Sequence, residues 1–126
     1  MENNRKILIV EDDIFIRDIY KVRFEQEGFE VTVAENGIVG LEKMQQGANP
    51  EIILLDIIMP GMNGIEVLKK IKANDEWKDI PVIMLTNISE KEKVTESMEL
   101  GIKEYLIKSH FTPSEVVQKV NALLNM

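Results

Sequence analysis

The stretch KILIVEDD, residues Lys6–Asp13, decides the fold: aliphatic side chains run without interruption into three acidic ones. A continuous apolar run of this length predicts a strand over Lys6–Val10 that is covered on both faces, as in the middle of a parallel sheet. Two further runs of the same kind, Ile52–Leu55 and Val82–Leu85, predict two more buried strands. The sequence therefore predicts a central parallel sheet, with polar residues placed directly after its strands.

Two weaker strands complete the sheet. Phe29–Ala34 alternates, with Phe29, Val31 and Val33 on one face, and this pattern is typical of an edge strand. A short apolar run at Tyr105–Ile107 predicts the fifth strand.

Segments with helical periodicity separate the strands. Apolar stripes at helical spacing predict four helices that pack on the sheet: Ile16, Ile19, Tyr20 and Phe24; Ile38, Leu41 and Met44; Ile65, Leu68 and Ile71; Val116, Val120 and Leu123. A further helix, the fourth in chain order, is predicted between Ser89 and Gly101 from its capping and stop signals. Capping signals mark where three of them begin, namely Asn63 with Glu66, Ser89 with Glu92, and Thr112 with Pro113 and Glu115. Gly28, Gly47 and Gly101 are the expected stops.

Strands that alternate with helices form βαβ units, which close right-handed onto a parallel sheet. We therefore expect one domain over residues 1–126, an α/β doubly wound (βα)5 sandwich with helices on both faces of a five-stranded parallel sheet. Periodicity does not fix the strand order, but the flavodoxin-like order 2-1-3-4-5 is the common solution for five strands.

Composition excludes several classes of protein. The chain has 126 residues, with 15 Lys and Arg against 22 Asp and Glu, a net charge of −7, and no run of basic residues. An acidic chain without a basic stripe is not expected to bind nucleic acid or membranes directly. No Cys is present, which excludes disulfides and thiolate metal sites. No apolar run is long enough to span a membrane and the N-terminus is polar, so we expect a cytoplasmic location without membrane insertion.

The residues that follow the strands carry the chemistry. The first strand runs into Glu11 and Asp12, the third into Asp56, the fourth into Thr86 and the fifth into Lys108. The carboxyl ends of parallel strands share one edge, where ligands bind, so these side chains should meet there. Two carboxylates ~4 Å apart repel by roughly 4 kcal/mol at an effective dielectric constant near 20. They therefore need a cation or a shared proton, and oxygen ligands on an open edge suit Mg²⁺.

Each residue alone has an ordinary explanation. Glu11 or Asp13 could serve only to cap the next helix, Asp56 could be a turn residue, and Thr86 and Lys108 singly would be unremarkable. Their joint occurrence at the ends of four strands favours a site. A carboxylate beside a hard cation, a lysine and a hydroxyl is suited to phosphoryl chemistry.

With these residues in place, the chain resembles the receiver domain of bacterial two-component response regulators, chemotaxis regulators among them. The resemblance runs from Lys6 to Leu124 and rests on four motifs in order. These are ILIVEDD at Ile7–Asp13, LLDIIMPGMNG at Leu54–Gly64, IMLTN at Ile83–Asn87 and YLIK at Tyr105–Lys108.

The resemblance implies a metal-assisted phosphoacceptor. Asp56 would take a phosphoryl group from the phosphohistidine of a sensor kinase or of a histidine phosphotransfer protein. Asp12 would bind Mg²⁺ directly together with Asp56, Glu11 would hold the ion through water, and the backbone carbonyl of Ile58 would complete the protein ligands.

The resemblance also implies a switch. Lys108 and the Thr86 hydroxyl would contact phosphoryl oxygens, and Tyr105 would turn inward as Thr86 moves. The face made by the fourth helix, fifth strand and fifth helix would then change shape and select an output partner. The protein would act as a monomer or as a dimer promoted by phosphorylation, with no metabolic activity beyond its own phosphotransfer and dephosphorylation. The sequence holds no output domain after the fifth helix, so we expect either a single-domain regulator that acts by docking or a receiver domain from a longer chain.

Two positions depart from the family pattern. Ser109 follows Lys108 where the family usually has a cis proline, so we expect a trans bond and a more mobile loop. Asn87 follows Thr86 where the family usually has Ala or Gly, and it could narrow access to the phosphoryl group. Ile58 and Ile88 are apolar where side chains can help to place the hydrolytic water, and we expect slow dephosphorylation.

Two other functions stay open at this point. A phosphatase of the haloacid-dehalogenase type also uses an Asp after a strand with Mg²⁺, but it needs a second Asp two residues on, where Ile58 stands. A pseudo-receiver or nucleotide-binding scaffold would act by interaction alone; the chain has no glycine-rich phosphate loop, which disfavours a nucleotide.

Overall fold

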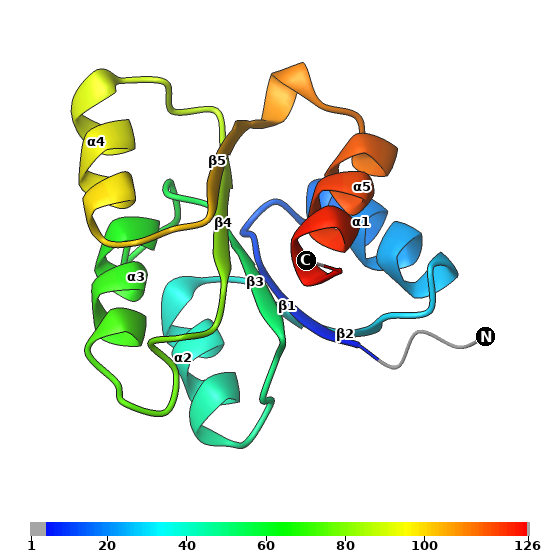
Figure 1. Cartoon of the computed structure of the whole chain (residues 1–126), viewed down its shortest axis with the longest axis horizontal. Coiled ribbons are helices and arrows are strands. Elements are labelled where there is room, and N and C mark those ends of the chain that lie inside the picture. Colours follow the sequence, from blue (N-terminus) through cyan, green and yellow to red (C-terminus); the bar gives the residue numbers. More distant parts are fainter. Residues whose placement is uncertain (1–4, 126) are drawn as a thin grey trace.

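The computed structural model describes residues 5–125. In that range the chain forms a parallel sheet of five strands in the order β2-β1-β3-β4-β5 (Figure 1). The strands are β1 (Lys6–Val10), β2 (Glu30–Ala34), β3 (Ile52–Leu55), β4 (Val82–Thr86) and β5 (Glu104–Ile107). The predicted architecture and strand order are both confirmed.

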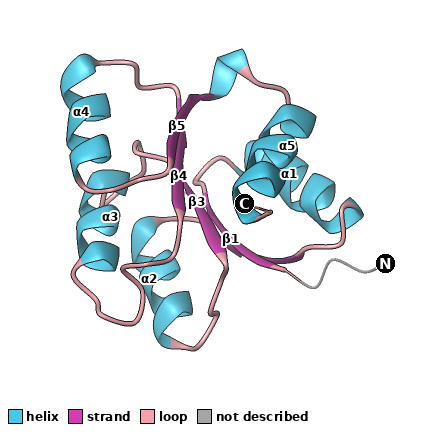
Figure 2. Ribbon diagram, in the orientation of Figure 1, coloured by secondary structure: helices cyan, strands magenta, loops and turns pink. Residues whose placement is uncertain are grey.

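Helices cover the two faces of the sheet. On one face lie α1 (Ile14–Gln26) and α5 (Pro113–Leu124), and on the other lie α2 (Gly37–Gln45), α3 (Gly64–Lys72) and α4 (Lys91–Glu99), so the molecule has three layers (Figure 2). A short 3-10 turn, η1 (Lys108–His110), follows β5 directly. No helix within residues 5–125 is long and apolar enough to cross a membrane.

The strands supply a core on each face. Leu8, Val10, Ile53 and Leu55 pack with α2 and α3, whereas the side chains between them pack with α1 and α5. Successive side chains point to opposite faces of a sheet, and this explains why β3 is apolar at every position and β1 at every position after Lys6. The alternating β2 lies at an edge, as predicted.

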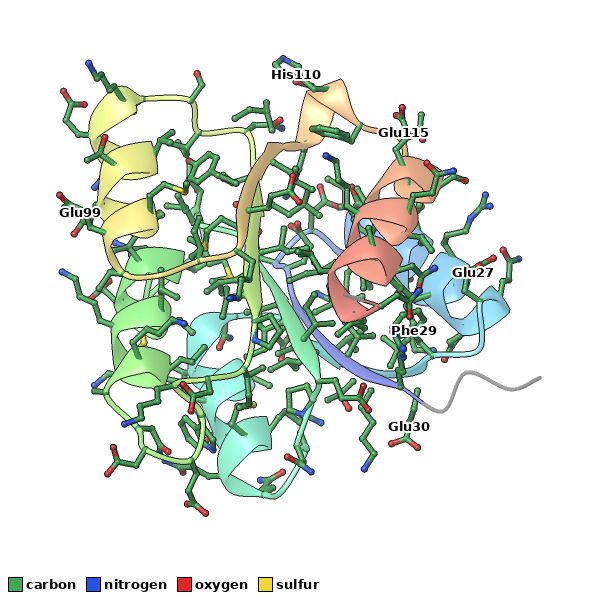
Figure 3. The ribbon with its side chains drawn as sticks, in the orientation of Figure 1. Glu27, Phe29, Glu30, Glu99, His110 and Glu115 are labelled. Carbon is green, nitrogen blue, oxygen red and sulfur yellow. The ribbon has the colours of Figure 1, made fainter. Side chains whose placement is uncertain are left out.

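Most of the acidic excess lies on the outside. The carboxylates of Glu27, Glu30, Glu99 and Glu115 are exposed around the periphery (Figure 3). Glu11 and Asp56 are different, since they are only 3% and 6% exposed. The buried acids are therefore set apart from the solvated ones, and they lie at the sheet edge.

Some sequence predictions need correction. Ile19 and Ile38 were expected to face inward, but each is 53% exposed. In α1 the buried side chains are Tyr20 and Phe24, with Ile16 packed beside them, and Ile19 lies at the border of that narrow stripe. Strands β4 and β5 are each one residue longer than predicted, because Thr86 and Glu104 still pair with the neighbouring strand. Strand β2 begins one residue later than predicted, at Glu30, because the N–H of Phe29 still donates to the carbonyl of Phe24 at the end of α1.

The expected cap of α4 at Ser89 is wrong. The carbonyl of Glu90 accepts the first helical hydrogen bonds, so Glu90 holds the N-cap position. No side chain caps the N-terminus of α4. The carbonyl of Ile88, just before, is held by the Tyr105 hydroxyl on β5. The caps at Asn63 and Thr112 are confirmed, each as a complete capping box.

Candidate phosphoryl and metal site

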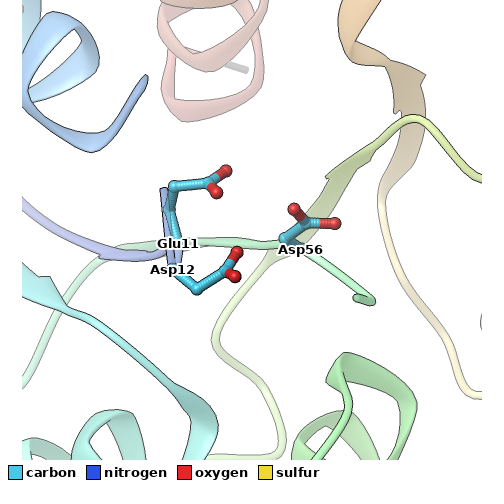
Figure 4. A group of neighbouring side chains, drawn as sticks. All are labelled: Glu11, Asp12 and Asp56. Carbon is cyan, nitrogen blue, oxygen red and sulfur yellow. The ribbon is translucent and has the colours of Figure 1, made fainter. Parts of the chain in front are cut away.

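Three carboxylates converge at the carboxyl edge of the sheet. Glu11 and Asp12 follow β1, Asp56 follows the neighbouring β3, and one oxygen from each lies within 4.8 Å of the others. Figure 4 shows the three side chains turned toward a common space. Glu11 and Asp56 are buried while Asp12 is exposed, so the cluster opens to solvent on the Asp12 side.

The backbone around Asp56 is fixed closely. Its N–H donates to the carbonyl of Val10 at 3.2 Å, which continues the pairing of β1 with β3. Gly64, the first residue of α3, packs on this turn and donates its N–H to the carbonyl of Ile57 at 2.8 Å. A Cβ on Gly64 would lie 2.0 Å from the carbonyl oxygen of Asp56. Only glycine lets α3 approach the backbone of Asp56 this closely.

Lys108 bridges the two buried carboxylates. Its Nζ lies 2.6 Å from Oδ2 of Asp56 and also donates to Oε1 of Glu11. Burial lowers the pKa of Lys108, but its hydrogen bonds to Asp56 and Glu11 outweigh burial and raise the pKa above its ordinary value. Burial raises the pKa of Glu11, whereas the hydrogen bonds from Lys108 and from the N–H of Asp13 lower it. Burial has the larger effect, so the pKa of Glu11 is above its ordinary value. The ammonium is therefore the counter-ion of the cluster.

Thr86 ends β4 and is fully buried. The N–H of Ile88 lies 3.4 Å from the Thr86 hydroxyl oxygen, a long contact that is easily exchanged for a better one. The Tyr105 hydroxyl donates to the carbonyl of Ile88 at 2.6 Å. Burial raises the pKa of Tyr105, and the charges of Asp56 and Glu90 raise it further. The loop after β4 is thus held between Thr86 and Tyr105.

The two unusual positions contact each other. The N–H of Ser109 donates to Oδ1 of Asn87 at 3.1 Å, which joins the loop after β4 to the turn after β5. No peptide bond within residues 5–125 is cis, so the expected trans bond after Lys108 is confirmed. The sequence placed both residues near the site but gave no signal that they meet.

The structure also separates acids that are adjacent in the sequence. The Asp13 side chain accepts from the N–H groups of Phe15 and Ile16, so it takes the helix-capping role considered for it and is not among the three clustered carboxylates. The Ile58 side chain is 61% exposed. Arg17 donates from Nη1 to the carbonyl of Glu11 at 3.0 Å, a contact that the sequence analysis missed because no local pattern marks it.

These groups suit a small hard cation. Every potential ligand in the cluster is a carboxylate oxygen, and two of the three carboxyls are buried with a single ammonium as partner. Hard divalent ions prefer oxygen ligands, and softer metals would be expected to recruit nitrogen or sulfur. The donor set therefore fits Mg²⁺, with Asp56 among the carboxylates that could hold the ion.

Comparison with known proteins agrees with this geometry. Residues 7–121 match the family of the response regulator receiver domain. The chain is 41% identical over 122 residues to the transcriptional regulatory protein ResD of Bacillus subtilis, which covers 97% of the chain and 49% of that protein. It is 34% identical over 120 residues to the chemotaxis protein CheY1 of Helicobacter pylori, which covers 94% of the chain and 96% of that protein.

Solved structures of receiver domains have the same fold as this chain. The crystal structure of a CheY-like receiver domain protein from Methanospirillum hungatei superposes with a TM-score of 0.89 at 31% identity, covering 98% of this chain and 95% of the other. The chain thus spans about half of ResD and nearly all of CheY1.

Proposed function

The chain belongs to the response regulator receiver domain family of two-component signalling, and we propose that it is switched by phosphorylation of Asp56. The observation that carries this proposal is the buried Asp56 carboxylate, paired with Lys108 and lying among two further carboxylates at an open sheet edge. The donor would be the phosphohistidine of a sensor histidine kinase or of a histidine phosphotransfer protein.

The transfer is a displacement at phosphorus. A carboxylate oxygen of Asp56 attacks the phosphoryl group, its bond to phosphorus forms, and the phosphorus–nitrogen bond to the donor imidazole breaks with its electron pair left on nitrogen. Hydrolysis reverses the covalent change at Asp56, since water attacks phosphorus and the carboxylate leaves. Both steps gather negative charge on the transferring group, so the site must supply positive charge.

Mg²⁺ would supply part of that charge. Asp12 and Asp56 would ligate it directly, Glu11 through water, and the carbonyl of Ile58 would complete the protein ligands. When bound, the ion offsets the charge on the phosphoryl oxygens and on the cluster. The exposed position of Asp12 supports this assignment, because an ion can enter from solvent on that side.

Lys108 and Thr86 would hold the phosphoryl group. The ammonium already lies 2.6 Å from Asp56, close enough to contact an oxygen attached there. The long contact between Thr86 and the N–H of Ile88 costs little to give up, so the hydroxyl is free to turn toward a phosphoryl oxygen. Ile88 is also the residue that Tyr105 holds.

The output would be read on the face of α4, β5 and α5. Movement of the loop after Thr86 breaks or shifts the hydrogen bond from Tyr105 to Ile88, and Tyr105 lies on β5 beside α4. The partner would be a downstream output protein or domain that docks there, in the cytoplasm, with the receiver as a monomer or a dimer promoted by phosphorylation. Gel filtration with and without a phosphoryl mimic would decide between these two states.

The phosphorylated form should be long-lived. Ile58 and Ile88 flank the site with apolar side chains, which cannot orient a hydrolytic water through a hydrogen bond. The rate at which the phosphorylated form decays after removal of the donor measures this directly.

Phosphorylation by acetyl phosphate with Mg²⁺ tests the proposal without a partner. The wild-type protein should be modified, and Asp56→Asn should not. An Asp-nucleophile phosphatase would instead turn over small phosphate esters in a continuing reaction, and a pseudo-receiver would do neither. The same samples therefore separate the three functions.

A further inference from the structure

Two loops at the sheet edge are fastened to each other beside the site. The loop after β4 presents Asn87, and the turn after β5 presents the N–H of Ser109, which donates to the Asn87 side chain at 3.1 Å. Asn87 is the residue next to Thr86, and Ser109 is the residue next to Lys108. One hydrogen bond therefore links the segments that carry the hydroxyl and the ammonium of the site.

This bond depends on the chemistry of both positions. Residue 87 must offer an acceptor on a short side chain, and residue 109 must carry a backbone N–H, which proline lacks. The serine hydroxyl itself takes no part, because the donor is the backbone. A variant at Asn87 can therefore break the bond, whereas removal of the Ser109 hydroxyl leaves it intact.

The bond matters most when a cation occupies the cluster. In the resting protein the Lys108 ammonium is held by Asp56 and Glu11. A bound divalent ion competes for oxygens of the same carboxylates, so it weakens both attachments of the lysine side chain. What then restrains Lys108 is its backbone, which lies in a 3-10 turn of only three residues.

We propose that Asn87 is a positioning residue that holds the backbone of Lys108 in place, through the N–H of Ser109, during phosphoryl transfer to Asp56. This inference rests on the proposed function and deepens it. The contact is exposed, so its loss leaves the core intact. Its effect should appear in the rate of phosphorylation and in the local protection of the Ser109 amide.

A steric role for Asn87 predicts the opposite sign. If the side chain merely narrowed access to the acceptor, truncation to alanine would speed phosphorylation. If it positions Lys108, truncation slows phosphorylation. A typical net hydrogen-bond contribution corresponds to a decrease of about three- to tenfold in rate.

The experiment compares wild type, Asn87→Ala, Asn87→Asp and Ser109→Ala. The rate of Asp56 phosphorylation is measured at saturating acetyl phosphate and Mg²⁺, and hydrogen exchange of the Ser109 amide is measured by NMR with and without Mg²⁺. We expect Asn87→Ala to slow the reaction and to expose the Ser109 amide, with an unchanged melting temperature. Ser109→Ala keeps the N–H and should match wild type in rate. Asn87→Asp keeps an acceptor oxygen and should restore amide protection.

Each other outcome overturns the inference. An unchanged or faster rate in Asn87→Ala, with a phosphorylated wild type, rejects the positioning role and leaves the proposed function standing. A slower rate without loss of Ser109 protection also rejects it, because Asn87 would then act by another route. If wild type itself is not phosphorylated, both the proposed function and the inference fail.

Discussion

The Nζ of Lys108 lies 2.6 Å from Oδ2 of Asp56. Asp56, which is expected to accept the phosphoryl group, is therefore already bound to the ammonium that is expected to contact an oxygen of that group. The same ammonium contacts Glu11, so one lysine neutralises part of a cluster that would otherwise repel itself. This pairing links the stability of the fold to the occupancy of the site.

Removal of Lys108 should destabilise the resting protein. In Lys108→Ala two buried carboxylates lose their counter-ion, and we expect a loss of about 1–3 kcal/mol in the free energy of unfolding without metal. Mg²⁺ should recover part of this loss. Lys21→Ala removes an exposed pair with Glu25 and is the control, with an expected change within about 0.5 kcal/mol. Urea unfolding with EDTA or with Mg²⁺ measures both. An equal loss in the two variants would contradict the pairing.

Mg²⁺ should stabilise the wild-type protein. At ten times its dissociation constant, a ligand that binds only the folded state contributes about 1.4 kcal/mol. Asp12→Asn should weaken Mg²⁺ binding, whereas Asp13→Asn should not, because the Asp13 side chain caps α1 instead. Thermal unfolding during a Mg²⁺ titration tests this, and equal weakening in the two variants would remove Asp12 from the ligand set.

Tyr105 should make the loop after β4 sensitive to high pH. The chain has two tyrosines, and the pKa of each is raised above 10.0, chiefly by burial. A raised pKa means that folding favours the neutral phenol. The stability that it contributes is therefore complete below pH 10 and is lost as the pH rises through the folded pKa.

The matching variant is Tyr105→Phe. It loses the hydrogen bond to Ile88 and should be about 0.5–1.5 kcal/mol less stable at neutral pH. The difference from wild type should shrink above pH 10. If the difference in the free energy of unfolding stays constant while the absorbance shows the tyrosines ionising, the proton of the Tyr105 hydroxyl does not stabilise the fold.

Gly64 should be intolerant of any side chain. In Gly64→Ala the new methyl group would lie 2.0 Å from the backbone oxygen of Asp56, so the acceptor loop or α3 must shift. We expect a loss of at least ~2 kcal/mol and impaired phosphorylation. Gly40→Ala is the control, because the nearest atom to its Cβ would be a Val10 side-chain methyl at 3.2 Å rather than backbone, and we expect a smaller loss. Equal stability of the two variants would contradict the close approach.

Sequence patterns predicted the sheet well because its signals are strong. Strand β3 is apolar at every position and β1 at every position after Lys6, since both faces are covered, and polar residues mark where each strand ends. The convergence of Glu11, Asp12 and Asp56 follows from parallel topology alone. The cap of α4 was predicted at Ser89 but lies at Glu90. The segment before it is held by the hydrogen bond from Tyr105 to Ile88, a tertiary contact that no local pattern signals.

Contacts between separate loops could not be predicted from the sequence either, because they too are tertiary contacts. The hydrogen bond between Asn87 and the N–H of Ser109 joins residues 22 positions apart through a backbone donor that every residue except proline provides. No residue type or spacing signals such a contact. The pairing of Lys108 with both Asp56 and Glu11 also depends on side-chain conformation rather than on pattern.

The most direct test of the central claim is the intact mass of the protein after incubation with acetyl phosphate and Mg²⁺. We predict that wild type gains one phosphoryl group, that the modified peptide contains Asp56, and that neither EDTA-treated wild type nor Asp56→Asn gains it. An unmodified wild type, or equal modification of Asp56→Asn, would contradict the account.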